Sequence, residues 1–228
     1  MAESNPSESD VAQPQHGEKE QRRFRAILIF VFIVLTILFL LFFFRGCEED
    51  SGLVMERFDR DAAGWIVKGD AQSASDEPEY EKRGGNPGGC VFAEDDGVGG
   101  VWYWSAPEDF RAKFAADVLE NRDNPQLRFV YDLKQSNVEN PFDNLDIILA
   151  GEGLELTFFH NSPPKLDWTS YATPLEAENW KVGRSENPAT EEQLAQVLNS
   201  LERIWIRGEY RTGNDIGHLD NVGLKLVD

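Results

Sequence analysis

A run of almost entirely apolar residues extends from Ala26 to Phe44 near the start of the chain. Its nineteen residues carry no charge, and only Thr36 has a polar side chain. As an α-helix rising about 1.5 Å per residue, the run would be about 28 Å long, close to the roughly 30 Å hydrocarbon thickness of a bilayer. The pattern predicts a transmembrane helix over residues 26–44, preceded by a disordered tail over residues 1–25 that is rich in Ser, Glu, Gln and Pro.

The charges that flank this run predict its orientation. Cytoplasmic flanks carry the excess of Lys and Arg, so we expect a cytoplasmic N-terminus and a C-terminal domain on the periplasmic or extracellular side of the cell (inner) membrane. A cleaved signal peptide is one alternative, although its apolar core is usually only about 7–15 residues long. A lipoprotein-type cleavage before Cys47 is another. The flanking basic residues are Lys19, Arg22, Arg23 and Arg25 before the run and Arg45 after it.

After an acidic tether over residues 45–52, the pattern changes to short apolar runs separated by Gly, Pro, Asn and Asp. Several runs alternate apolar and polar residues, which is typical of strands with one face on a core. Gly151-Glu152-Gly153 predicts a hairpin turn between two of them, and the Gly-rich segment 84–89 predicts another turn. Residues 53–228 are long enough for one β-sandwich. The predicted strands are 65–67, 90–92, 101–104, 127–131, 145–149, 154–158, 204–206 and 222–226.

Two segments break the strand pattern. Thr190 and Gln193 have the spacing of a capping box at the start of a helix. Residues 194, 197, 198 and 201 that follow form a single apolar stripe at helical spacing, which we expect to pack on one end or face of the sandwich. Residues 110–125 could form a second short helix. The predicted fold class is therefore an all-β sandwich with one or two short helices, preceded by a single transmembrane helix.

The net charge limits the class of partner. The chain has a formal charge of −19 at pH 7, and residues 1–45 contain five acidic and five basic side chains, so the whole excess lies beyond them. Such a surface repels nucleic acid and anionic lipid headgroups. We expect a protein partner in or on the membrane or an envelope glycan, with bilayer contact confined to residues 26–44 and no nucleic acid.

Two cysteines are too few for a disulfide framework. A bridge between Cys47 and Cys90 would require the tether to fold back, and nothing in the sequence requires this, so we expect a buried, unbridged Cys90. The three histidines, His16, His160 and His218, lack the spacing of zinc ligands.

Separate aromatic, Gly-rich and Asp-containing motifs follow one another through the domain. They are FDRDAAGWIVKGDA at 58–71, GGNPGG at 84–89, WYWSAP at 102–107, FVYDL at 129–133, IRGEY at 206–210 and LDNV at 219–222. This order resembles the laminin B domain (laminin domain IV) across residues 53–228. The resemblance implies a jelly-roll-like β-sandwich related to galactose-binding-like folds. It implies no catalytic residues and no agreed ligand.

Asp220 is the carboxylate that the pattern singles out. If residues 218–227 form a strand, Asp220 shares a face with Val222 at the edge of a core. A buried carboxylate must be paired, hydrogen-bonded or metal-bound. Galactose-binding-like sandwiches often hold a structural calcium where the first and last strands meet, so the resemblance implies a Ca²⁺ site at Glu56, Asp59 and Asp220, completed by backbone carbonyls. Alternatively, Asp220 accepts hydrogen bonds from loop amides or pairs with an Arg.

The aromatic residues suggest a glycan or partner contact, because sugars stack on exposed rings. Trp168, Tyr171 and Trp180 lie in a Pro-rich stretch that loops at one end of the sandwich could present. The alternative is that these rings pack in the core. The three aromatic residues at 102–104 alternate between strand faces, so one face must be buried there in any case.

No segment has the spacing of a catalytic or phosphate-binding motif. The Gly-rich segment 84–89 lacks the Lys-Ser/Thr ending of a phosphate-binding loop, and no Gly-x-Ser-x-Gly sequence occurs. Acidic pairs are too abundant in this chain to indicate glycoside hydrolysis. We therefore expect no enzyme, but a membrane-tethered, non-catalytic binding module that recognises a surface or envelope glycan or protein. The alternative is an accessory structural subunit of a larger membrane complex.

Overall fold

The computed structural model describes residues 25, 27–36, 52–69, 76–95 and 99–227 of the 228-residue chain. The chain divides into two compact units, Met1–Asp50 and Ser51–Asp228.

In the first unit, residues 27–36 form a helix whose large apolar side chains are exposed. The hydroxyl of Thr36 donates a hydrogen bond to the carbonyl of Phe32, at 2.8 Å. Within the described part of the chain, no helix has both the length and the apolar character needed to cross a membrane. The predicted span over residues 26–44 extends beyond the described residues and therefore stays a prediction.

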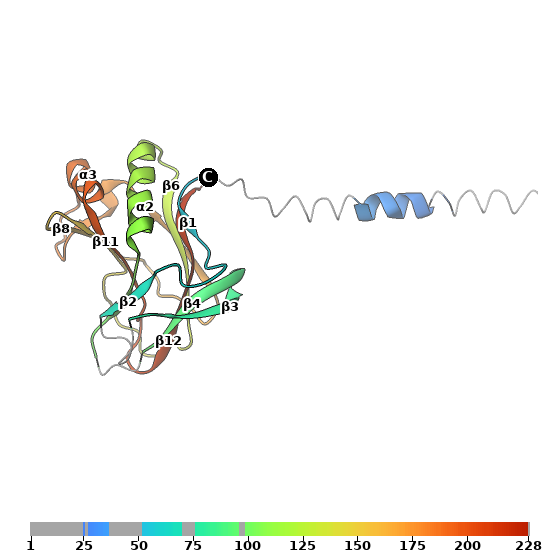
Figure 1. Ribbon diagram of the computed structural model, residues 1–228, viewed down its shortest axis with the longest axis horizontal. Helices are drawn as coiled ribbons and strands as arrows, with labels where there is room; N and C mark the ends of the chain where they lie inside the picture. The colour runs from blue at the N-terminus through green and yellow to red at the C-terminus, as the bar shows by residue number, and fades with distance from the viewer. Residues whose placement is uncertain (1–24, 26, 37–51, 70–75, 96–98, 228) are drawn as a thin grey trace, which may run out of the picture. The chain divides into compact units, whose positions relative to one another are not determined.

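The second unit is an all-β sandwich of two antiparallel sheets (Figure 1). The first sheet has the strand order β3-β4-β12-β6-β9, with β1 also paired to β12, and the second has the order β10-β8-β7-β11-β5-β2. The strands of the first sheet are β1 (Met55–Glu56), β3 (Glu79–Gly85), β4 (Gly88–Asp95), β6 (Leu127–Gln135), β9 (Thr169–Pro174) and β12 (Asp215–Leu226). Those of the second are β2 (Ile66–Gly69), β5 (Trp102–Ser105), β7 (Ile147–Gly151), β8 (Leu154–Phe158), β10 (Lys181–Val182) and β11 (Leu201–Arg207).

Alternate residues of the strands face a core between the two sheets. Phe129, Tyr131 and Leu133 of β6 are fully buried there, as are Ile204 and Ile206 of β11. Burying an aliphatic or aromatic side chain of this size contributes about 1.5–3 kcal/mol. Several strands are buried on both faces, β5 and β7 at every position. Each of the predicted strands overlaps an observed one.

The helix expected near residue 190 is α3 (Glu191–Asn199). The capping box is formed: the Thr190 hydroxyl accepts from the backbone N–H of Gln193 at 3.3 Å, and the Gln193 side chain accepts from the N–H of Thr190 at 2.9 Å. Its apolar stripe packs on β7 and β8. The stripe is one residue shorter than predicted, because Leu201 begins β11.

The segment 110–125 overlaps α2 (Glu108–Asn121), so the second expected helix is confirmed. Phe110, Phe114 and Val118 of α2 are buried in the main core. The two helices contact each other and lie at the same end of the sandwich (Figure 1). The Pro-rich stretch over residues 162–180 was expected to present its aromatic residues on loops, but it contains β9 and the short 3-10 helix η1 (Ala177–Asn179).

Candidate functional site

The predicted position of Asp220 is corrected by a bulge in β12. Asp220 pairs with Asp132, but Gly223 pairs with Val130, so β12 has one extra residue in this interval. Asn221 takes up that residue with φ 50°. The bulge reverses the alternation, so Asp220 lies with Asp132 on the outer side of the first sheet instead of sharing a face with Val222.

Asp220 is nevertheless fully buried, and its hydrogen bonds come from amides. Oδ2 accepts from the backbone N–H of Asn86 at 2.5 Å and Oδ1 from that of Asn221 at 2.7 Å. The side-chain amides of both asparagines donate to Oδ2 of Asp132, at 3.0 and 2.8 Å. Burial raises the pKa of Asp220 to about 7, although the two backbone amides oppose the rise. Hydrogen bonding to loop amides, one of the readings of Asp220 that the sequence left open, is therefore observed.

The three predicted calcium ligands have different surroundings. The Glu56 carboxylate accepts from the backbone N–H groups of Arg57 and Phe58 at 3.0 and 2.8 Å, which caps its own loop. Asp59 is near enough to Asp220 to raise its pKa. Among the described residues, no three Asp, Glu, His or Cys side chains are grouped so that they could hold a metal ion. Calcium binding stays a prediction that this geometry does not test.

The three aromatic residues of the predicted glycan contact are not brought to one exposed surface. Trp180 is 0 % exposed and donates a hydrogen bond from Nε1 to the carbonyl of Pro174 at 3.0 Å. Tyr171 is also buried and stacks on Tyr131, with ring centroids 5.3 Å apart. Only Trp168 is partly exposed. Two of the three rings therefore belong to the core, which was the alternative reading.

Trp168 belongs instead to a row of half-buried side chains on the outer side of the first sheet, which we call the ring row: Phe92, His218, Lys134 and Trp168. His218 is paired with Phe92 of β4 and Lys134 of β6, and Trp168 immediately precedes β9. The His218 ring stacks on Phe92 at 5.7 Å and meets Trp168 edge-on at 6.2 Å. Lys134 Nζ lies 5.0 Å from the Trp168 ring centre. Burial lowers the pKa of His218 to about 4, so this ring is uncharged at neutral pH.

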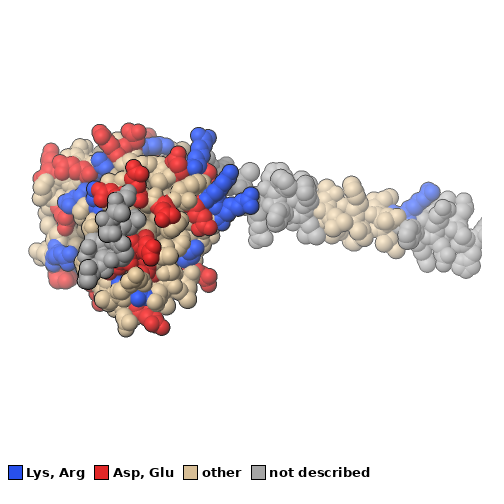
Figure 2. All heavy atoms as spheres, turned by 60° about the horizontal axis from the view of Figure 1, so that its bottom comes forward, with Lys and Arg blue, Asp and Glu red and all other residues tan. Residues whose placement is uncertain are grey.

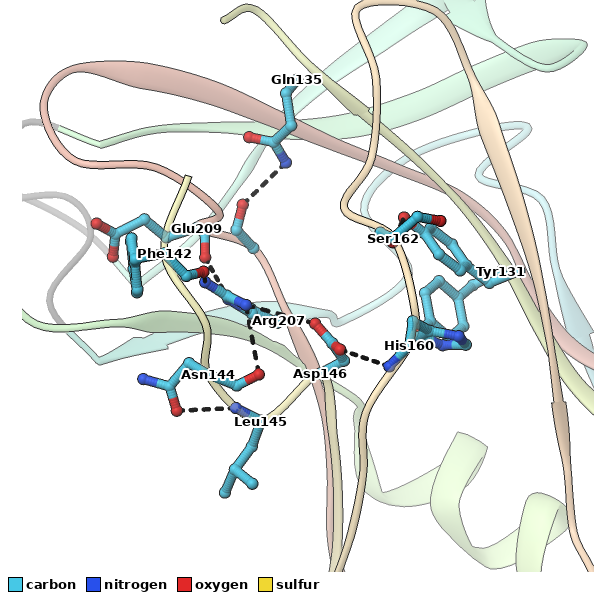
Figure 3. Close-up of polar contacts among 12 residues, drawn as sticks. Tyr131, Gln135, Phe142, Asn144, Leu145, Asp146, His160, Ser162, Arg207 and Glu209 are labelled. Carbon is cyan, nitrogen blue, oxygen red and sulfur yellow. Dashed lines mark hydrogen bonds and ion pairs between the residues drawn. The ribbon is translucent and has the colours of Figure 1, made fainter. Parts of the chain in front are cut away.

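A second polar centre surrounds Arg207, at the end of β11 (Figure 3). Its Nε donates to the carbonyl of Glu209 at 2.5 Å, and its Nη2 donates to that of Phe142 at 2.6 Å. The guanidinium lies between the rings of Phe142 and Tyr210, whose centroids are 4.6 and 4.3 Å from Cζ. Arg207 is almost fully buried. It therefore holds the β6–β7 loop against the segment that follows β11.

Asp146 is the charged partner of Arg207. Its Oδ1 lies 3.5 Å from Nη1 of Arg207, and its Oδ2 accepts from the backbone N–H of His160 at 2.7 Å (Figure 3). Burial raises the pKa of Asp146, against the lowering effects of the His160 amide, Arg207 and Tyr210. His160 shares a hydrogen bond with the Tyr131 hydroxyl at 2.8 Å, and burial lowers its pKa to about 4. This histidine is therefore a neutral packing residue.

A cavity of about 160 Å³ opens beside this centre, between the β6–β7 loop and the β8–β9 loop. Its floor is formed by the buried residues Asp146, Arg207 and Tyr210, and its rim is mostly exposed. Phe159 on the rim is 51 % exposed. The remaining lining residues are Pro141, Phe142, Asp143, Asn144, His160, Asn161, Ser162 and Pro163.

Reasoning from the sequence missed both arrangements. Phe92, Lys134 and His218 come from three strands, and only the pairing of β12 with both β4 and β6 brings them together. The cavity joins a loop near residue 143 to one near residue 161, across the β7–β8 hairpin. The IRGEY motif at 206–210 was the available signal, since Arg207 and Tyr210 belong to it.

Two solved structures are distantly similar to this chain. The L4b domain of human laminin alpha-2 is 15% identical, with a TM-score of 0.49, and the match covers 72% of this chain and 98% of that domain. A family 30 carbohydrate-binding module of a Clostridium thermocellum cellulosomal cellulase is 11% identical, with a TM-score of 0.48 and coverage of 77% and 99%. With TM-scores below 0.5, neither likeness says what this chain binds.

The sequence family is decided by a different comparison. No curated protein matches the chain. The family model of laminin B (domain IV) matches residues 103–228, which is more than half of the 228 residues. The matched region begins in β5 and includes the ring-row residues Lys134, Trp168 and His218, as well as Arg207 and its partners. The chain therefore belongs to the laminin B (domain IV) family.

Proposed function

We propose that this chain is a membrane-tethered, non-catalytic binding module whose sandwich lies on the exported side and recognises a surface or envelope glycan. The family supports a module without catalytic residues. The apolar run and its flanking charges support the tether and its orientation.

The observation that carries the glycan part of the proposal is the ring row. A saccharide has apolar C–H faces and polar hydroxyl edges, and binding sites for such ligands combine aromatic side chains with a few placed polar groups. Phe92, His218 and Trp168 provide partly exposed rings, and Lys134 provides a cation beside them. The amide and carboxylate groups around Asp132 and Asp220 lie on the same side of the sheet.

The charge of the surface indicates which glycans fit. Asp and Glu side chains are spread over the face seen in Figure 2, with fewer Lys and Arg among them. The formal net charge of the chain is −19. An acidic surface repels polyanions, so we expect a neutral or amino-sugar polymer and weak binding of uronate or phosphate polymers.

The test is binding of the full chain, purified in detergent, to a panel of neutral, amino-sugar and anionic polysaccharides by affinity electrophoresis. Trp168→Ala should weaken binding to the retained glycan by about tenfold or more, because a central aromatic contact commonly carries at least about 1–2 kcal/mol. Val138→Ala removes another exposed apolar side chain outside the ring row and should leave binding unchanged. Failure of the unaltered chain to bind any glycan would contradict the proposal.

A further inference from the structure

The cavity beside Arg207 contains buried polar atoms whose hydrogen bonds within the fold are long or incomplete. Asp146 is 4 % exposed, and its Oδ1 makes no hydrogen bond of ordinary length with another described residue. The ion pair to Arg207 Nη1 is long, at 3.5 Å. The buried Tyr210 hydroxyl on the cavity floor is close enough to Asp146 to lower its pKa, but it also makes no hydrogen bond of ordinary geometry with a described residue. Buried polar atoms are normally hydrogen-bonded, so each such atom requires an explanation.

From this geometry we propose that the cavity is a second binding site, which takes one terminal sugar unit of a glycan with a hydroxyl donating to Oδ1 of Asp146. The proposal rests on the proposed glycan-binding function but uses residues separate from the ring row.

The polar groups on the cavity floor favour a ligand that donates a hydrogen bond. Three nitrogens of Arg207 already donate to backbone carbonyls, those of Phe142, Asn144 and Glu209. A carboxylate has about four acceptor positions, and Asp146 uses one for the amide of His160. What remains is acceptor capacity at Asp146 and the Tyr210 hydroxyl, which interacts with Asp146 without an ordinary hydrogen bond. A ligand hydroxyl satisfies both groups.

The rim favours a sugar over an anion or a simple amine. Phe159 presents a half-exposed ring for the apolar face of a sugar, and Asn161 and Ser162 present exposed polar groups for its edge. Asp143 on the same rim disfavours an anionic ligand. An amine would satisfy Asp146 but would leave the ring and the rim polar groups without partners.

The volume of the cavity matches a single sugar unit. Its volume of about 160 Å³ is that of about five water molecules at roughly 30 Å³ each. Drug-sized ligands occupy pockets of about 300–1,000 Å³. The cavity is therefore too small for an extended saccharide, and the end of a chain is the part that fits.

The test is titration of the full chain in detergent with free monosaccharides, observed by saturation-transfer NMR. Neutral hexoses, an N-acetylated amino sugar, a uronate and butylamine form the panel. We expect a neutral or N-acetylated sugar to bind, and Phe159→Ala and Asn161→Ala each to weaken it by about tenfold or more. Both side chains are on the exposed rim, so neither change should prevent folding. Leu166→Ala, in the same β8–β9 loop but outside the cavity lining, is the matched control and should bind normally.

Four results would overturn the inference. They are no binding of any monosaccharide, binding that Phe159→Ala and Asn161→Ala leave unchanged, preference for the uronate, and binding of butylamine in place of sugars. The proposed function has its own readout, the loss of polysaccharide binding in Trp168→Ala. Polysaccharide binding that depends on Trp168, together with any of these four results, would overturn the cavity site and leave the proposed function standing.

Discussion

At the scale of single residues, burial raises the pKa values of two acids and lowers those of two histidines. Burial, with help from the neighbouring Asp95, raises the pKa of Glu209 to about 7, and burial raises that of Asp220 to about 7. The folded state binds these two protons more tightly than the unfolded state does. The stability that this difference contributes is lost as pH rises from about 4.5 to 7. Burial lowers the pKa of His160 and His218 to about 4. Their contribution to the stability of the folded state is lost as pH falls from about 6.5 to 4.

The effect of Glu209 on the pH dependence of stability can be measured by comparing Glu209→Gln with the unaltered chain. The glutamine carries no titrating proton, so the variant escapes the loss of stability that Glu209 causes as pH rises. We expect the melting temperature of the variant, relative to the unaltered chain, to rise between about pH 5 and pH 8. Thermal melts at intermediate pH values measure the difference.

Glu202→Gln, at an exposed position on β11, is the matched control and should show a constant difference over the same range. A constant difference for Glu209→Gln as well would show that Glu209 does not titrate near neutral pH.

At the scale of elements, the β7–β8 hairpin shows how a turn follows from its residues. Gly151 pairs with Leu154, so the turn consists of Glu152 and Gly153, whose φ angles are 49° and 73°. Positive φ at both turn residues favours Asn-Gly. Gly153 meets this requirement, whereas Glu152 is strained in the left-handed region.

Glu152→Asn should therefore stabilise the domain by about 0.5–1 kcal/mol, because Asn adopts positive φ at lower cost than Glu. The free energy of unfolding in urea measures the change. Gly153→Ala, which adds a Cβ at a positive φ, should have the opposite effect. Equal stability of all three chains would contradict the turn conformation.

Strand prediction failed where strands are at edges or carry little apolar sequence. β3 is largely exposed and polar, and it forms by backbone pairing with β4. β9 lies in the Pro-rich stretch and forms by pairing with β6, which places Tyr171 in the core. Backbone hydrogen bonds to a neighbouring strand do not require alternating apolar residues in an edge strand. The sequence pattern therefore could not predict β3 and β9.

At the scale of the whole molecule, the two units have different surfaces. Residues 27–35 expose apolar side chains in the first unit, whereas the second buries its apolar residues in one main core and is strongly acidic outside. The apolar run is rich in Phe, Leu and Ile and has no Gly-x-x-x-Gly motif, which would favour close helix pairing.

We therefore expect the native full chain, solubilised in mild detergent, to elute from a sizing column without other proteins. Multi-angle light scattering on the peak gives the mass of the protein component. Elution in a larger assembly with other chains would contradict this expectation and would support an accessory subunit of a membrane complex.

The sequence by itself determined the β-sandwich, its family, both helices and the apolar run, because periodicity, caps and turn residues are local properties. Only the tertiary structure decided which rings are buried, which amides hold Asp220 and where the cavity lies. A period of two shows that a strand has two faces, but not which face meets the core or what covers the other. One extra residue in β12 reverses that assignment, and pairing between strands distant in sequence assembles both proposed sites.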